Sequence, residues 1–143
     1  MEIDRNGLEI LDRDECLRLL GQATLGRVGV TIGALPSVVP VNYRVVGDEV
    51  VILTGAGTKL DAATKNAVVA FEVDDMDPVE HTGWSVMVTG MAREVVDEAE
   101  IAALTRRPLP HWAPGGRERI IAISTEIASG RRIVHGAPAP TAS

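Results

Sequence analysis

The sequence predicts a mainly β protein whose strands form an antiparallel barrel interrupted by two or three short helices. Short segments rich in β-branched residues recur along the chain and are separated by Gly, Pro and Asp breaks, which is typical of strands joined by tight turns. Strict alternation of strands and helices is absent, which argues against a Rossmann domain. With 143 residues, the chain is expected to form one domain with one core.

The first third of the chain predicts one helix and three strands. Asp12 followed by Glu15 has the spacing of a capping box, and apolar residues follow it, so we expect a helix over Arg13 to Gln22. Segments rich in β-branched residues then predict three consecutive antiparallel strands: Leu25 to Ile32, Ser37 to Val46 and Glu49 to Thr54. Turns that contain Gly separate these strands, as expected in a meander.

The middle of the chain predicts a short helix followed by two strands. We expect the helix over Lys59 to Asn66, a strand over Ala67 to Val73 and an acidic loop over Asp74 to Gly83. A long strand follows over Trp84 to Val96, and apolar side chains occur on both of its faces. Both faces are therefore expected to be at least partly covered, as in a closed barrel with a partner on its outside.

The last third predicts a helix, an irregular connection and two strands. Asp97 and Glu100 repeat the capping-box spacing, which predicts a helix that ends near Arg106. Several prolines and a Gly pair follow and impose an irregular connection. The remaining strands are expected over Arg117 to Thr125 and over Arg131 to Val134.

Composition limits the location and the partners of the chain. The 14 basic and 20 acidic residues give a formal net charge of −6 without a dense run of arginines, so no nucleic acid partner is expected. The chain shows neither a long apolar segment nor a signal peptide, so we expect a cytoplasmic protein without a membrane partner. Residues 136–143 have the Pro and Ala content of a linker, so we place one domain over residues 1–135 and a disordered tail after it.

Few residues have the pattern of a metal site or of a nucleophile. Asp77, Glu80 and His81 lie in one short acidic segment without a second histidine cluster, so a solvated loop is favoured and no metal site is expected. Cys16 is the single cysteine and lies among apolar residues, which indicates a packed thiol. His111 lies between prolines, in a segment expected to form a lid or an interface loop. No residue stands out as a catalytic base.

The segment Gly55 to Leu60 is a candidate anion site. It joins a predicted strand to a predicted helix, where backbone N–H groups point outward and glycines let the backbone approach an anion closely. The Thr58 hydroxyl and the Lys59 ammonium would complete the site, and Lys59 would supply much of the attraction. The alternative is a plain capping structure, because Gly-rich turns before helices are common. The spacing differs from that of a P-loop.

Three segments taken together resemble a known family. They are Val38-Val39-Pro40-Val41-Asn42-Tyr43, Thr54-Gly55-Ala56-Gly57-Thr58-Lys59 and Gly83-Trp84-Ser85-Val86-Met87-Val88-Thr89-Gly90. In this order they are similar to the pyridoxamine 5′-phosphate oxidase-like superfamily of FMN-binding split barrels, particularly the small bacterial flavin and deazaflavin oxidoreductases. The resemblance runs from about Leu8 to Ile133.

The resemblance implies a fold and a cofactor site. It implies a six-stranded antiparallel split β-barrel of Greek-key topology that forms a homodimer, with FMN, or alternatively a deazaflavin coenzyme, in a groove between the subunits. The strand from Val39 to Tyr43 would pass along the isoalloxazine, and its main chain would bond the polar edge of the ring. Pro40 and Val41 would cover the flat face, and Asn42 would add a side-chain hydrogen bond.

The two other segments of the resemblance carry the remaining site residues. Thr54, Thr58 and Lys59 match positions that bind the flavin phosphate in the family. Trp84 and Ser85 match positions that contact the flavin from the neighbouring chain.

The chain also departs from the family pattern. Where the family often has a second basic residue at the phosphate, this chain has Leu60, which leaves open how tightly FMN binds and whether another flavin is preferred. The C-terminal substrate-binding segment of true pyridoxamine phosphate oxidases has no counterpart here, so oxidation of vitamin B6 is not expected.

Several of these residues also have a structural interpretation. Tyr43 and Trp84 would be core aromatics in an ordinary barrel. Pro40 inside a strand belongs at an edge or a bulge, because proline cannot donate to a ladder. Arg131 and Arg132 would either reach a negative group of a ligand or balance the surface charge of the sheet.

The resemblance implies an FMN-dependent oxidoreductase. It would transfer hydride or electrons between a reduced nicotinamide or deazaflavin and a small organic acceptor or oxygen, with the cofactor carrying the chemistry. One alternative is a non-catalytic protein that stores, shuttles or senses a flavin, a deazaflavin or haem. Another is an empty barrel that serves as a structural or interaction module.

Overall fold

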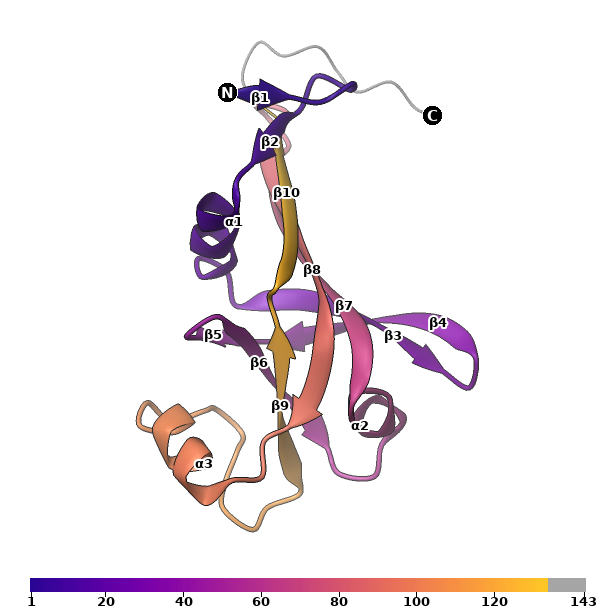
Figure 1. The fold of residues 1–143 in the computed structure, drawn as a ribbon, viewed down its shortest axis with the longest axis vertical. Coiled ribbons are helices and arrows are strands. Elements are labelled where there is room, and N and C mark those ends of the chain that lie inside the picture. Colours follow the sequence, from indigo (N-terminus) through magenta and orange to yellow (C-terminus); the bar gives the residue numbers. More distant parts are fainter. Residues whose placement is uncertain (134–143) are drawn as a thin grey trace.

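Segments rich in β-branched residues fold into ten strands, and three short helices connect them, within residues 1–133, which are those that the computed structural model describes (Figure 1). The strands are β1 (Glu2–Ile3), β2 (Glu9–Leu11), β3 (Leu25–Ile32), β4 (Leu35–Asn42), β5 (Arg44–Val46), β6 (Glu49–Gly55), β7 (Ala67–Asp77), β8 (Thr82–Glu94), β9 (Glu118–Ser124) and β10 (Ile127–Ile133). The helices are α1 (Arg13–Leu20), α2 (Lys59–Ala63) and α3 (Glu98–Leu104). The tail expected over 136–143 and the end of the expected domain lie outside the described residues.

The strands form one antiparallel sheet that curves into a barrel. Six of them pair in the order β4-β3-β7-β8-β9-β6, and β5 pairs with the free side of the first half of β6. The terminal strands β4 and β6 approach each other without pairing, so the barrel has a split between them. The predicted six-stranded split β-barrel is therefore confirmed. β10 continues along β8 and joins the barrel to β2 and β1.

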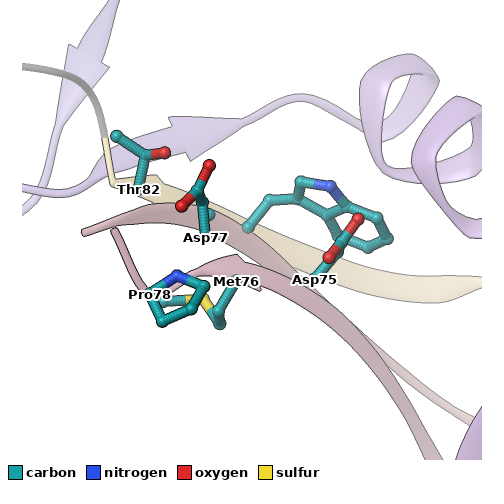
Figure 2. A pocket seen from close by; sticks show the side chains of 7 residues that line it. Asp75, Met76, Asp77, Pro78 and Thr82 are labelled. Carbon is teal, nitrogen blue, oxygen red and sulfur yellow. The ribbon is translucent and has the colours of Figure 1, made fainter. Parts of the chain in front are cut away.

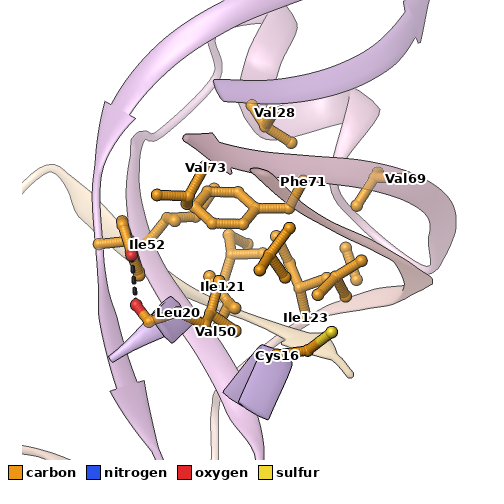
Figure 3. Close-up of a cluster of buried hydrophobic side chains, with 14 of the residues drawn as sticks. Cys16, Leu20, Val28, Val50, Ile52, Val69, Phe71, Val73, Ile121 and Ile123 are labelled. Atoms are coloured by element: carbon orange, nitrogen blue, oxygen red, sulfur yellow. Dashed lines mark hydrogen bonds between the residues drawn. The ribbon is translucent and has the colours of Figure 1, made fainter. Parts of the chain in front are cut away.

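The interior of the barrel is filled by apolar side chains from the inward faces of the strands (Figure 3). The largest of them is Phe71, which is fully buried and meets the ring of Tyr43 edge-on, with centroids 4.8 Å apart. Helix α1 closes one side of this core with Cys16, Leu19 and Leu20, which are all buried. The packed thiol predicted for Cys16 is confirmed, and burial raises the pKa of this thiol.

Helices α1 and α3 begin where their capping residues predict. The carboxylate of Asp12 accepts a hydrogen bond from the Glu15 amide at 2.9 Å, and Asp97 accepts one from the Glu100 amide at 2.9 Å. Each cap satisfies an amide that has no partner inside its helix. Helix α1 ends at Leu20, two residues before the predicted end.

The prediction of an acidic loop over Asp74 to Gly83 is wrong for most of this segment. β7 continues to Asp77 and β8 begins at Thr82, so only residues 78–81 form the turn. Asp75 pairs with Trp84 and Asp77 with Thr82 in a regular ladder. Strand pairing overrides the low β-propensity of aspartate here, because the acidic side chains are exposed to solvent while the backbone is paired.

Several further segments differ from the prediction, among them α2, which ends at Ala63 rather than at Asn66. The strand expected over Ser37 to Val46 is interrupted at Tyr43, because β4 pairs with β3 whereas β5 pairs with β6. The final strand begins at Ile127 rather than at Arg131. The short strands β1 and β2 were not predicted, since two or three residues are too few to show a period.

Candidate functional site

A groove with a volume of about 650 Å³ lies at the split of the barrel. One wall is the segment Val39 to Arg44, and the other is the segment Val51 to Leu53 of β6. Leu60 at the start of α2 and the segment Arg107 to His111 also line the groove, although Pro108 does not. The groove therefore brings together all five residues predicted from Val39 to Tyr43.

The groove exists because β4 is an edge strand. β4 pairs with β3 on one side only, so backbone N–H and C=O groups on its other side are not used by a ladder. Pro40, which lacks a backbone N–H, is placed in this strand, and the predicted edge position is confirmed. Val39 and Val41 are half-buried, whereas Pro40 and Asn42 are exposed.

Tyr43 borders the groove but belongs mostly to the core. Its side chain is 8% exposed, and its hydroxyl donates a hydrogen bond to the Leu20 carbonyl. Burial raises the pKa of Tyr43 to about 12. The ring therefore supports the groove wall from behind.

The turn from Gly55 to Thr58 is held by hydrogen bonds within the turn and to α2. The Thr58 side chain caps α2: its oxygen accepts from the Asp61 amide at 3.1 Å, and its hydroxyl donates to the Gly55 carbonyl at 2.7 Å. Gly57 has a φ of 80°, a conformation that costs glycine little. The amides of Ala56, Gly57 and Thr58 all donate to partners within the chain, so the capping interpretation describes this turn.

Asp61 is a buried carboxylate beneath this turn. Its residue is 1% exposed, and it accepts hydrogen bonds from the Gly57 amide and from the Thr54 hydroxyl, each at 2.9 Å. Burial opposes its ionisation, but these bonds and Lys65 outweigh that effect and lower the pKa of Asp61. Asp61 was not among the residues predicted from the sequence, although Thr58 and Asp61 have the spacing of a capping box.

The two lysines of the chain differ in their partners. Lys65 lies 3.3 Å from the Asp61 carboxylate and 3.6 Å from that of Glu94. Lys59 is exposed at the first position of α2 and forms no ion pair with any residue of the described range 1–133. The hydroxyls of Thr54 and Thr58 are both bonded, so among the three predicted phosphate ligands only the polar group of Lys59 has no partner within residues 1–133. The assignment of phosphate contacts to Thr54, Thr58 and Lys59 stays a prediction.

Trp84 and Ser85 lie outside the groove. Trp84 lines a second hollow of about 520 Å³ at the β7–β8 hairpin, together with residues 75–78, 82 and 83 (Figure 2). Trp84 and Ser85 pair with Arg132 and Arg131 of β10, beside the strand β2. In Figure 1 this end of β8 lies next to β1 and β2, whereas α2 lies toward the other end of the molecule. One chain therefore does not bring the two groups of predicted residues together.

The groove also contains charged residues that the sequence analysis did not assign to the site. Arg44, Arg107 and Glu118 line it. Arg44 donates to the carbonyl oxygens of Arg107 and Pro108, each at 2.7 Å, and so fixes the segment that carries His111. Arg44 directly follows Tyr43, and this position is the sequence feature that could have assigned Arg44 to the site.

Arg131 and Arg132 form ion pairs within the chain. Arg131 lies 3.0 Å from Asp4, and Arg132 lies 3.3 Å from Glu9 and 3.2 Å from Glu15. Both arginines therefore tie β10 to the N-terminal segment and to α1, as the surface-charge interpretation predicts.

Neither a metal-binding cluster nor a membrane-spanning helix is found within residues 1–133. These residues contain no group of three His, Cys, Asp or Glu side chains arranged to hold a metal ion. None of the helices they form is long and apolar enough to cross a membrane.

Comparison with known proteins gives a consistent result. Residues 12–132 match the family described as pyridoxamine 5′-phosphate oxidase. An uncharacterized protein of Mycobacterium tuberculosis is 42% identical over 135 residues, which cover 91% of this chain and 88% of that protein. An FAD binding protein from Mycobacterium smegmatis is 36% identical, with a TM-score of 0.77, over 88% of this chain and 100% of that chain. A conserved protein of unknown function from Corynebacterium diphtheriae is 28% identical, with a TM-score of 0.74, over 90% of this chain and 99% of that chain.

Proposed function

The chain belongs to the flavin-binding pyridoxamine 5′-phosphate oxidase family, and on this premise we propose that it is an oxidoreductase with a flavin nucleotide in the groove at the barrel split. The observation that carries the proposal is that the groove unites the segment Val39 to Tyr43, the edge of β6 and the start of α2. A bound flavin supplies hydride and electron transfer, and the chain binds it, orients it and shields it from water.

The residues present fit a flavin. The groove volume of about 650 Å³ lies within the usual range for ligand pockets. Val39, Val41 and Leu53 offer apolar surface to a flat ring, and the unpaired edge of β4 offers backbone groups to its polar side. Lys59 has no partner in the described chain and would meet the phosphate.

A homodimer would complete the site. Val38, Gly29, Ala70, Thr89 and Ile127 are aligned across β4, β3, β7, β8 and β10, so they share the outer face of the sheet. The two ends of this row are exposed apolar side chains, Val38 at 70% and Ile127 at 67%, and exposed apolar side chains on one sheet face favour an interaction surface. We propose that a second copy of the chain covers this face and brings its Trp84 and Ser85 to the groove.

FMN is the flavin that we propose first, in line with the resemblance to FMN-binding split barrels. FAD is the second candidate, because the Mycobacterium smegmatis relative is an FAD binding protein and because Leu60 leaves Lys59 without a basic neighbour. A deazaflavin coenzyme is the third. All three would place the isoalloxazine or its deaza analogue along Val39 to Tyr43.

The visible absorption spectrum of freshly purified protein is the first test. Bands at roughly 370 and 450 nm are expected for a bound flavin. Release of the ligand and its mass identify FMN, FAD or a deazaflavin, and titration of ligand-free protein ranks their dissociation constants. Protein that arrives without a chromophore and binds none of the three would overturn the proposal.

Turnover separates the enzyme from a non-catalytic carrier. The loaded protein is mixed with NADH or NADPH and with quinone, nitro or oxygen acceptors, and loss of the nicotinamide absorbance is followed. Steady turnover with one pair supports the oxidoreductase. Tight flavin binding without transfer to any acceptor supports the carrier that stores or shuttles the cofactor.

A further inference from the structure

The groove has two ends, and different charged residues lie at each. At one end, Glu118 pairs with Gly55, directly before the turn that carries Lys59. At the other end, Arg44 pairs with Val51. Val51 and Gly55 are four residues apart on one strand, so the two ends are separated by about 13 Å at roughly 3.3 Å per residue. A flavin phosphate at Lys59 would therefore leave the Arg44 end free for another group.

The Arg44 end is formed by a segment that is fixed in place. Leu109 is 8% exposed and packs into the apolar cluster below α3, so the segment is anchored by burial. The Arg44 guanidinium donates to the carbonyl oxygens of Arg107 and Pro108, each at 2.7 Å. Burial, followed by the charge of Arg107, lowers the pKa of Arg44.

Two side chains of this segment line the groove without a partner among the described residues. Arg107 is exposed and forms no ion pair within residues 1–133, and His111 is likewise exposed and unpaired there. His111 also has a φ of 69°, in the left-handed region that a non-Gly residue rarely adopts. The only acidic side chain among the groove residues of the described chain is Glu118, at the opposite end.

We propose that Arg107 and His111 form an anion-binding subsite for the molecule that exchanges electrons with the flavin. The chemistry recognised is a phosphate or carboxylate group, which the Arg107 guanidinium binds by charge-assisted hydrogen bonds while the His111 ring adds a polar contact. Arg44 is a positioning residue, because it acts through the carbonyl groups that hold this segment. The inference rests on the proposed flavin site, since it assigns the part of the groove that the flavin phosphate does not use.

The test uses the full chain loaded with FMN and inorganic pyrophosphate as the probe anion. Calorimetric titration is expected to show saturable binding to the wild type at about 0.1 M salt, where surface charges are partly screened. Arg107→Gln is expected to raise the dissociation constant of pyrophosphate about tenfold, because one charge-assisted contact is lost. Arg106→Gln removes an equal charge from the adjacent exposed residue that does not line the groove, and is expected to change it less than twofold.

A second measurement distinguishes an anion of the reaction partner from a phosphate of the cofactor. The dissociation constants of FMN and FAD are determined for the wild type and for Arg107→Gln. Values for both flavins within twofold of wild type support a subsite for the reaction partner. A variant that loses FAD affinity but keeps FMN affinity would assign the subsite to the second phosphate of the cofactor, which overturns the inference.

Failure of the inference and failure of the proposed function give different results. A wild type that binds none of FMN, FAD and a deazaflavin overturns both before any variant is made. A wild type that binds flavin but not pyrophosphate, or a folded Arg107→Gln protein that binds pyrophosphate as the wild type does, overturns the inference alone. The melting temperature of each variant confirms that the comparison is made between folded proteins.

Discussion

The groove at the barrel split and the hollow at the β7–β8 hairpin are built differently. The groove lies between an unpaired strand edge and a fixed loop, and it is lined by Val39 to Arg44, β6 and the start of α2. The hairpin hollow lies on a regular ladder and is lined by exposed acidic residues and by Trp84. Yet the resemblance implies that residues of both regions touch one flavin.

If a flavin binds as we propose, this difference means that each chain of a dimer would carry two half-sites. At the groove, the turn before α2 is held by hydrogen bonds that Asp61 and Thr58 accept from backbone amides. The β7–β8 hairpin has no comparable set of buried hydrogen bonds among the described residues. Whether it contacts a flavin therefore depends on which molecule packs against it. A second chain is the simplest way to bring Trp84 to the groove, so the comparison can be tested by changing each region separately.

The largest effect is expected on flavin affinity, when a groove variant and a hairpin variant are combined in one mixed dimer. Lys59→Ala and Trp84→Ala are each expected to weaken flavin binding by at least about tenfold, because each removes a contact of one half-site. A mixed dimer of one Lys59→Ala chain and one Trp84→Ala chain has one intact site, so it is expected to bind one flavin with wild-type affinity. Binding is measured by titration of affinity-tagged mixed dimers.

The control for this experiment is Lys65→Ala. Lys65 is paired with Asp61 and Glu94, so its removal is expected to change flavin affinity much less than removal of Lys59. A mixed dimer that binds no better than the two parent variants would show that both half-sites belong to one chain.

The next effect concerns the carboxylate below the groove turn. Asp61→Ala leaves the Gly57 amide and the Thr54 hydroxyl without their partner, so we expect a loss of about 3 kcal/mol in the free energy of unfolding. Asp75→Ala, in the hairpin, removes an exposed carboxylate and is expected to cost less than about 0.5 kcal/mol. Urea unfolding measures both losses. Equal losses of unfolding free energy in Asp61→Ala and Asp75→Ala would show that the two carboxylates do not differ in their contribution to stability.

Asp61 also predicts a dependence on pH. Its pKa lies below the ordinary value of 3.8, because the bonds from Gly57, Thr54 and Lys65 outweigh the burial that opposes ionisation. A lowered pKa in the folded state stabilises the protein above the unfolded pKa, and this contribution is lost as the pH falls through the folded pKa. Acid unfolding below about pH 4 is therefore expected to be less steep in Asp61→Asn than in the wild type.

A smaller effect is expected from deleting the hydroxyl that supports the groove wall. Tyr43→Phe leaves the Leu20 carbonyl without this donor and is expected to lower the free energy of unfolding by about 1.5 kcal/mol. Ser85→Ala deletes a hydroxyl of the hairpin region that has no hydrogen bond within residues 1–133, and is expected to cost less than about 0.5 kcal/mol. Thermal unfolding of the two variants measures the difference.

The same tyrosine predicts a loss of stability in alkali. Burial raises the pKa of Tyr43 from 10.0 to about 12. A raised pKa in the folded state gives a contribution that is present below the unfolded pKa and is lost as the pH rises toward about 12. Tyr43→Phe is expected to lack this contribution, and an identical alkaline transition in both proteins would contradict the assignment.

The smallest effect is expected at the cap of α2. Thr58→Ala removes the side-chain acceptor of the Asp61 amide and is expected to cost about 1 kcal/mol of stability. Its effect on flavin affinity is expected to be smaller than that of Lys59→Ala, because the positive charge stays in place. A larger loss of affinity in Thr58→Ala would mean that the hydroxyl, rather than the ammonium, binds the phosphate.

The sequence by itself determined the local features of the protein. Capping residues located the starts of α1 and α3, and β-branched segments located the strands over Leu25 to Ile32 and Glu49 to Thr54 within one residue. The edge position of Pro40 also followed from the sequence, because a missing backbone N–H is a property of the residue itself. These features depend on neighbours in the chain, so a short window of sequence contains their cause.

Only the tertiary structure decided how these pieces make a site. The acidic segment Asp74 to Asp77 became a strand because its backbone pairs with β8, and the split between β4 and β6 became a groove because the two strands approach without pairing. Arg44 and the segment around Arg107 are about sixty residues apart in sequence, yet two hydrogen bonds join them. Contacts between distant residues depend on the path of the whole chain, so no local pattern could reveal them.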